Sequence, residues 1–185
     1  MTTNGLRPDE RPFEASGAFA PSADAGPAES FDSRPSPSIL VREARIEDLV
    51  AIVDLLADDA GGSRREGGDL APYAAAFARM TADPHQLQAV ADLGGQIVGT
   101  LQLSLIPSLT RRGTMRAQIE GVATLSTLRG RGIGEELLGW ALSTAKSRGA
   151  GLVQLTSAVE RGNAHRFYEH LGFVASHTGF KLELR

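Results

Sequence analysis

The chain of 185 residues contains no cysteine, and this absence excludes disulfides, thiolate nucleophiles and cysteine-based metal sites. Long apolar runs are also missing, since no stretch approaches the roughly 18 apolar residues that a membrane-spanning helix needs. The formal net charge is only −3, so neither a nucleic-acid partner nor an anionic membrane surface is indicated. We therefore expect a cytoplasmic protein with one folded domain and with no nucleic-acid or membrane partner.

Valine and isoleucine are missing from residues 1–37, which hold six of the nine prolines among many Ala, Ser, Gly and Asp residues. Such a segment buries too little apolar surface to offset the entropy lost on ordering, so we interpret it as a disordered tail. It also lacks the continuous apolar core of a secretory signal. Residues 38–185 are then expected to form the folded domain.

The four histidines form no metal-binding pattern. His165 and His170 are five positions apart, outside the i,i+4 register that places two ligands on one helical face. No metal site is predicted.

Hydrophobic periodicity divides residues 38–185 into strands and helices. Residues 86–92 alternate apolar and polar side chains, a Leu93-Gly94-Gly95 turn follows, and residues 97–106 return, which indicates a β-hairpin. The full expected order is a strand at 39–44, a helix from Leu49 to a stop at 60–62, a helix from Asp69 to Met80, the hairpin, a strand around Ile119, a helix that stops at Gly149, a strand at 151–156, a helix at 163–171, and an antiparallel pair at 173–176 and 179–184.

Glycines alternate in the stretch 127–138, which reads TLRGRGIGEELL and lies between the strand around Ile119 and the next helix. The first backbone N–H groups of a helix have no partner within the helix and lie at the positive end of its dipole, so they bind phosphate oxygens. Arg129 and Arg131 add donors that can grip a phosphate through two parallel hydrogen bonds. The stretch therefore predicts a ligand that carries phosphate.

Two familiar phosphate motifs fit this stretch poorly. A nucleoside-triphosphate loop requires Lys followed by Ser or Thr after its last glycine, whereas Gly134 is followed by two glutamates. A dinucleotide fingerprint requires a third glycine where this chain has Leu137, and an acid at the end of the next strand, which is missing here. A nicotinamide enzyme is a disfavoured alternative.

The sequence 129–134, RGRGIG, resembles the acyl-CoA signature of the GCN5-related N-acetyltransferase (GNAT) superfamily. Residues 119–122, IEGV, occupy the place of the central strand that carries the acid in that family, and residues 163–173, NAHRFYEHLGF, are similar to its late helical segment. The resemblance covers roughly residues 39–185.

The resemblance implies an α/β fold with a central mixed, mostly antiparallel and twisted sheet of six to seven strands, flanked by about four helices. It also implies an N-acetyltransferase that moves an acetyl group from acetyl-CoA, without a metal, to a primary amine of a small molecule or amino acid. A non-catalytic acyl-CoA-binding regulatory module and a protein N-acetyltransferase stay open as alternatives. Dimers are frequent in the superfamily, so a homodimer is one expected assembly.

Two residues are the candidate catalytic groups. By strand alternation Glu120 shares one face of an otherwise core-like strand with Val122. Partial desolvation there would make its carboxylate a better base for the amine; a surface ion pair with Arg116 or with a cross-strand basic residue is the alternative. Tyr168 is the candidate acid, because a phenol can protonate a departing thiolate. By resemblance its hydroxyl points at the CoA sulfur; a core tyrosine is the alternative.

The candidate acyl-CoA-binding residues fall into three segments. The backbone of the central strand can pair with the amide-rich pantetheine arm as an added strand does. Asn163 can cap its helix, contact the ligand by resemblance, or do both. The full set is Val122, Ala123, Thr124, Arg129, Gly130, Arg131, Gly132, Ile133, Gly134, Asn163 and Phe167.

A basic run of Arg111, Arg112 and Arg116 precedes the central strand. It can receive an acidic substrate, or it can simply be solvated, which is the commoner role of such runs.

Overall fold

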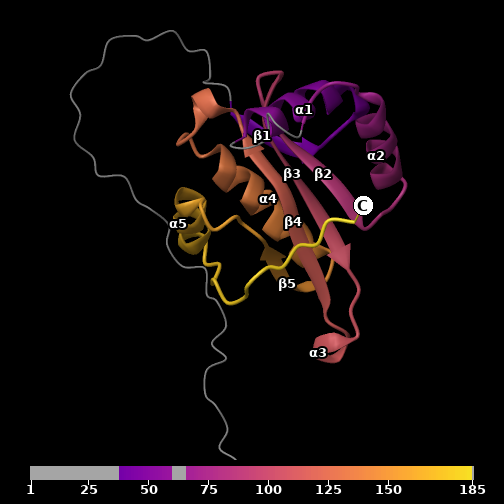
Figure 1. Ribbon diagram of the computed structural model, residues 1–185, viewed down its shortest axis with the longest axis vertical. Coiled ribbons are helices and arrows are strands. Elements are labelled where there is room, and N and C mark those ends of the chain that lie inside the picture. The colour runs from indigo at the N-terminus through magenta and orange to yellow at the C-terminus, as the bar shows by residue number, and fades with distance from the viewer. Residues whose placement is uncertain (1–37, 60–65, 185) are drawn as a thin grey trace, which may run out of the picture. The chain divides into compact units, whose positions relative to one another are not determined.

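The computed structural model describes residues 38–59 and 66–184 (Figure 1). The tail expected at residues 1–37 lies outside this range. In chain order the elements are β1 Ile39–Glu43, η1 Ile46–Asp48, α1 Leu49–Asp58, α2 Ala71–Thr81, β2 Gln86–Leu93, β3 Gln96–Ile106, α3 Thr110–Gly113, β4 Met115–Thr124, η3 Ser126–Leu128, α4 Ile133–Ser147, β5 Ala150–Leu155 and α5 Gly162–His170. None of the described helices combines the length and apolar character that crossing a bilayer requires.

The strands form one sheet in the order β1-β2-β3-β4-β5. β1, β2, β3 and β4 pair antiparallel with their neighbours, and β4 pairs parallel with β5. The parallel pair follows from the connection, because α4 carries the chain from one strand back to the start of the next. The expected hairpin is confirmed as β2 and β3, and the mixed, mostly antiparallel sheet is confirmed as well.

Helix α4 covers one face of this sheet with an apolar stripe of Ile133, Leu137, Leu138, Ala141 and Ala145, all buried. The stripe repeats every three or four residues, as an amphipathic helix requires. It meets inward-facing side chains of β2, β3 and β4, among them Leu101, Leu103 and Ile119. Helices α1 and α2 contact the sheet through β3, β4 and β2 (Figure 1). Their buried side chains include Ile52, Val53, Leu55 and Phe77.

A bulge interrupts β4 after Glu120. The pairing with β3 shifts register between Thr100 and Gln102, and Gly121 has a φ of 58°. That left-handed conformation is readily available to glycine and strained for most other residues. The expectation that Val122 shares a face with Glu120 is therefore wrong: the extra residue turns the Val122 side chain onto the α4 core.

The antiparallel pair expected at 173–176 and 179–184 is also absent. Residues 173–184 form no strand, so the described residues contain five strands rather than six or seven. The segment runs in front of the sheet in Figure 1 with Phe180, Leu182 and Leu184 at least 86% exposed. These residues alternate as in a strand, yet alternation defines only a face and supplies no neighbouring strand.

Gly99 of β3 tests the contact between the sheet and α4. A methyl group at this position would lie 2.9 Å from Cγ2 of Ile133 and 2.9 Å from Cδ1 of Leu137. Both neighbours are buried, so we expect Gly99→Ala to lower the free energy of unfolding by about 1–3 kcal/mol in urea titrations.

The matched control is Gly139→Ala, on the exposed side of α4, where the added methyl group meets nothing within 4 Å. It should be neutral or raise the free energy of unfolding by about 0.5–1 kcal/mol, as alanine does in a helix. Equal effects of the two variants would contradict the close contact of α4 with Gly99.

Candidate active site

β4 separates from β5 at the candidate site. The two strands pair from Met115 opposite Ala150 to Ile119 opposite Leu155, and the pairing ends there. β4 continues through Thr124 while still paired with β3 on its other side. On the open side, the backbone of 121–124 has no strand partner among the described residues. The gap leaves amide and carbonyl groups ready for an extended ligand that carries amides of its own.

Two side chains on this part of β4 are turned into the protein. Ala123 is 3% exposed, and Val122 packs against the core. Of the predicted binding residues Val122, Ala123 and Thr124, the first two can therefore act only through their backbone. The same holds for Ile133, whose side chain is 3% exposed and belongs to the α4 stripe.

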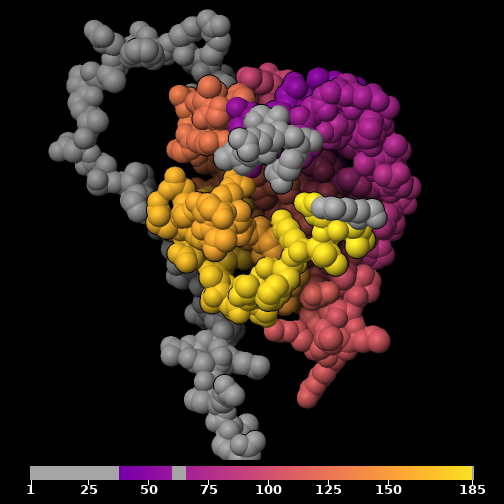
Figure 2. Space-filling view, in the orientation of Figure 1, coloured from indigo at the N-terminus to yellow at the C-terminus, as the bar shows by residue number. Residues whose placement is uncertain are grey.

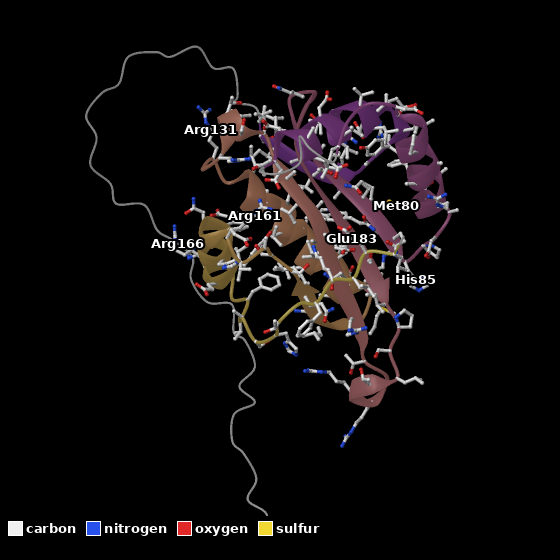
Figure 3. The ribbon with its side chains drawn as sticks, viewed as in Figure 1. Met80, His85, Arg131, Arg161, Arg166 and Glu183 are labelled. Atoms are coloured by element: carbon white, nitrogen blue, oxygen red, sulfur yellow. The ribbon has the colours of Figure 1, made fainter. Side chains whose placement is uncertain are left out.

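The glycine turn, residues 129–134, leads directly into α4 and includes the first two residues of that helix. Gly132 is the residue before the helix and has a φ of 80°, in the left-handed region that glycine tolerates. No side chain caps the first turn of α4, so its N–H groups remain available to an anion. Arg129 and Arg131 are exposed beside the turn. Figure 3 shows Arg131, Arg161 and Arg166 along one side of the molecule, near this turn and α5.

Helix α5 packs against the same turn through Phe167. A methyl group at Gly134 would lie 3.1 Å from Cζ of Phe167, so the ring presses directly on that glycine. The ring centroids of Phe167 and Tyr168 are 5.4 Å apart, and those of Tyr168 and Phe173 are 6.0 Å apart. This row of aromatic rings connects the glycine turn to Tyr168, the candidate acid.

Tyr168 is partly buried, and burial raises the pKa of its phenol above the ordinary value. The nearby charges oppose each other, since Arg161 lowers this pKa and Asp59 raises it. The phenol is therefore protonated at neutral pH, as a proton donor must be.

Asp59, just beyond α1, binds two arginines. Its Oδ1 lies 2.9 Å from Nη2 of Arg161, the residue before α5, and 3.8 Å from Nη2 of Arg129 in the glycine turn. The preceding residue, Asp58, accepts a hydrogen bond of 2.8 Å from the backbone N–H of Ser126. That contact lowers the pKa of Asp58. Asp58 and Asp59 thus connect the end of α1 to the segment that follows β4 and to the start of α5.

Sequence reasoning missed this contact. Asp59 and Arg161 are 102 positions apart, and neither belongs to a motif. The only local sign was a pair of acids at the end of a helix, where the dipole disfavours negative charge.

Asn163 does not cap α5. The helix begins at Gly162 with Arg161 at the cap position, so Asn163 already lies inside the first turn. Its Oδ1 instead accepts a hydrogen bond from Nη2 of Arg166. The capping interpretation is wrong because the helix begins one residue earlier than expected. A contact with a ligand stays a prediction.

Glu120 is exposed, so the desolvation expected from its core-like strand is not found. Its neighbours Ala117 and Ile119 are buried on the other face of the strand. Glu120 lies opposite Gln102 of β3, and the alternative ion pair with Arg116 does not form among the described residues.

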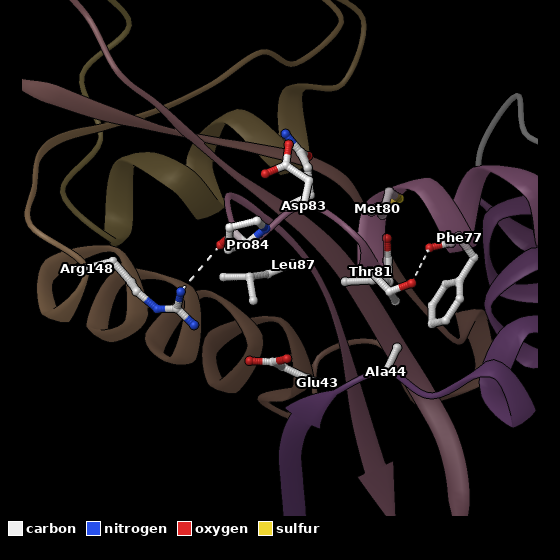
Figure 4. Close-up of a pocket in the computed structure, with 11 residues that line it drawn as sticks. Glu43, Ala44, Phe77, Met80, Thr81, Asp83, Pro84, Leu87 and Arg148 are labelled. Atoms are coloured by element: carbon white, nitrogen blue, oxygen red, sulfur yellow. Dashed lines mark hydrogen bonds between the residues drawn. The ribbon is translucent and has the colours of Figure 1, made fainter.

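A cavity of about 220 Å³ lies elsewhere, between α2, the start of β2 and the end of α4 (Figure 4). Arg148 donates a hydrogen bond of 3.4 Å across it to the carbonyl of Pro84. None of the predicted site residues lines this cavity. Among the described residues, no three of His, Asp and Glu lie close enough to hold a metal ion.

Comparison of the sequence with known proteins gives consistent matches. The profile of the acetyltransferase (GNAT) family matches residues 27–173. Aminoalkylphosphonate N-acetyltransferase of Salmonella typhimurium is 29% identical over 140 residues, which are 76% of this chain and 88% of that protein. Glucosamine 6-phosphate N-acetyltransferase of Trypanosoma brucei brucei is 34% identical over 90 residues, which are 49% of this chain and 59% of that protein.

Solved structures show the same fold. A protein from Bacillus halodurans C-125, described as a transcriptional regulator, has a TM-score of 0.77 and 45% identity, over 80% of this chain and 100% of that chain. A putative acetyltransferase from Agrobacterium tumefaciens has a TM-score of 0.72 and 33% identity, over 79% of this chain and 100% of that chain.

The opposing charges around Tyr168 can be tested by titration. A guanidinium stabilises the phenolate, so Arg161→Gln should move the titration of Tyr168 to higher pH. The chain has two tyrosines, so a Tyr73→Phe background isolates the signal of Tyr168 in the ultraviolet absorbance of tyrosinate. Arg166→Gln, an exposed change on the same helix, is the control and should leave the titration in place. A pKa of Tyr168 that stays the same or falls in Arg161→Gln would contradict the conclusion that Arg161 lowers this pKa.

Proposed function

The chain belongs to the acetyltransferase (GNAT) family, and from this premise we propose that it transfers an acetyl group from acetyl-CoA to a primary amine of a small molecule or amino acid. The observation that carries the proposal is the open edge of β4 directly before the glycine turn. The edge offers pairing to the amides of pantetheine, and the turn offers N–H groups to the diphosphate. Arg129 and Arg131 supply positive charge next to it.

The proposed reaction is a direct transfer in a ternary complex. Glu120 takes a proton from the ammonium group of the acceptor, directly or through a water. The amine nitrogen then bonds to the acetyl carbon while backbone N–H groups of β4 polarise the carbonyl. The bond between that carbon and sulfur breaks, and Tyr168 gives its proton to the departing thiolate. The nitrogen loses its second proton as the amide forms, and this proton returns through solvent to the Tyr168 phenolate. No enzyme nucleophile is needed, which suits a chain without cysteine.

The relatives support a small acceptor. By their names, the Salmonella protein acetylates aminoalkylphosphonates and the trypanosomal protein acetylates glucosamine 6-phosphate. Both acceptors are small amines that carry an oxyanion.

A second function has one observation in its favour. The structure with 45% identity is described as a transcriptional regulator, which fits a module that binds acyl-CoA without turnover. The two candidates differ in thiol release: an acetyltransferase frees CoA from acetyl-CoA when a suitable amine is present, and a sensor binds acetyl-CoA and frees none. A panel of amines assayed for free thiol, with calorimetry for acetyl-CoA binding, separates them.

Tyr168→Phe tests the proposed acid. The ring packing between Phe167 and Phe173 should survive, so the fold and acetyl-CoA binding are expected to persist. Turnover should fall roughly 10²–10⁴-fold, because the thiolate leaves without a proton donor. Tyr73→Phe, which removes the hydroxyl of the other tyrosine, should have a far smaller effect. Unchanged turnover in Tyr168→Phe would remove Tyr168 from the mechanism.

Glu120→Gln tests the proposed base. Turnover at neutral pH should fall roughly 10²-fold or more, because the amine must lose its proton without help. The loss should shrink as the pH approaches the pKa of the acceptor amine, since more of the amine is then already deprotonated. Glu47→Gln changes another exposed acid and should leave the rate near the wild-type value. An equal loss at every pH would argue against a base at position 120.

A further inference from the structure

Arg116 lies on the same face of β4 as Glu120. Side chains alternate along a strand, and Ala117 and Ile119 are buried on the α4 side, so Arg116, Gln118 and Glu120 lie on the opposite face. The bulge begins only after Glu120 and does not disturb this order. An arginine and a glutamate thus stand four residues apart on one face of the central strand.

No hydrogen bond or ion pair joins the side chain of Arg116 to another of the described residues. Among the described residues, only two buried side-chain polar atoms lack a hydrogen bond, the Nε of Arg116 and the Oγ of Ser157. Buried N–H groups are nearly always paired, so such an atom needs a reason. The residues in register with Arg116 are apolar, Ile106 on β3 and Leu152 on β5. Arg116 takes part in none of the ion pairs of the described residues.

The surface between the two charges is polar and uncharged. Gln118 accepts a hydrogen bond of 2.8 Å from Gln154 of β5, which holds its amide in place. On the neighbouring strands, Gln86 accepts hydrogen bonds from Ser104 at 2.7 Å and from Gln102 at 3.1 Å. Amides and hydroxyls hydrogen-bond polar ligands without choosing a charge. Figure 2 shows a recess on the face toward the viewer, between α1 and α2 on one side and α5 with the C-terminal residues on the other.

We propose that Arg116 binds an anionic group of the acceptor, a carboxylate, phosphate or phosphonate, while the acceptor amine faces Glu120. The inference rests on the function proposed above and names the class of acceptor: a small amine with an oxyanion at its other end. Guanidinium groups bind these planar or tetrahedral oxyanions through paired hydrogen bonds.

The spacing and the surrounding charge suit such an acceptor. Four residues of strand span roughly 13 Å between Cα atoms, and the long arginine side chain shortens the distance that the ligand must bridge. Glu120 repels an anion and attracts an ammonium group, which orients the ligand in one direction. Arg111 and Arg112 are exposed in α3, just before β4, and add positive potential at the end where the anion is bound.

The experiment compares acceptors that differ only in their far end: 2-aminoethylphosphonate, β-alanine and the neutral β-alaninamide. For the wild-type protein we expect kcat/KM to be at least 10-fold higher for an anionic acceptor than for the neutral one. Arg116→Gln should lower kcat/KM for the anionic acceptors roughly 10–100-fold, chiefly through KM, and leave the neutral acceptor unchanged. Comparison of kcat/KM for 2-aminoethylphosphonate and for β-alanine shows whether a phosphonate or a carboxylate is preferred.

Two further variants separate binding from folding. Arg116→Lys keeps the charge and should retain part of the preference for an anion, whereas Lys146→Gln removes an exposed charge of α4, on the other face of the sheet, and should change that preference little. Equal losses for charged and neutral acceptors in Arg116→Gln would give Arg116 a structural role and overturn the proposal. So would a wild-type protein that acetylates all three equally.

A binding measurement keeps the two proposals distinguishable. If no amine is acetylated, the proposed function fails, and calorimetry with 2-aminoethylphosphonate in the presence of CoA still tests the anion site. Binding to the wild type with loss in Arg116→Gln would support the site. Equal binding to both proteins, or binding to neither, would overturn it.

Discussion

The separation of β4 from β5 is the constraint on which the candidate site depends. The strands are hydrogen-bonded through Ile119 and part there, so one side of β4 keeps unpaired backbone groups up to Thr124. The bulge at Gly121 occurs at the same point and turns Val122 into the core while Glu120 stays exposed. The same short stretch of β4 therefore leaves a backbone edge free for the proposed donor and keeps a carboxylate accessible to the proposed acceptor.

The other parts of the site are tied to this point by packing and charge. Phe167 presses on Gly134, so the glycine turn and α5 are in direct contact. The ring of Tyr168 lies beside that of Phe167 at a tilt, and the charges of Arg161 and Asp59 act on its phenol. Groups from α1, the turn and α5 thus meet around one side of β4, although they are far apart in the sequence.

Local patterns predicted most of the fold, and non-local contacts account for the errors. The hairpin and α4 could be predicted because alternation, helical periodicity and glycine stops act over a few residues. The face of Val122 was predicted wrongly because one bulge reverses the alternation of the strand. Gly121 was the only sign of this bulge in the sequence. The last strand pair was mistaken because a strand-like pattern does not specify a neighbour. The glycine turn and Tyr168 were proposed from motifs, whereas Asp59 belongs to no motif and so was not predicted.

The two arginines on Asp59 are not held equally: the Arg161 contact is 2.9 Å and the Arg129 contact 3.8 Å. An incoming phosphate can draw the looser arginine away without leaving the carboxylate alone, because the tighter one remains. The end of α1 then keeps its attachment to α5 whether or not the turn is occupied. Sharing one anion between a fixed and an exchangeable cation would let the proposed donor arrive and depart while the framework around it stays in place.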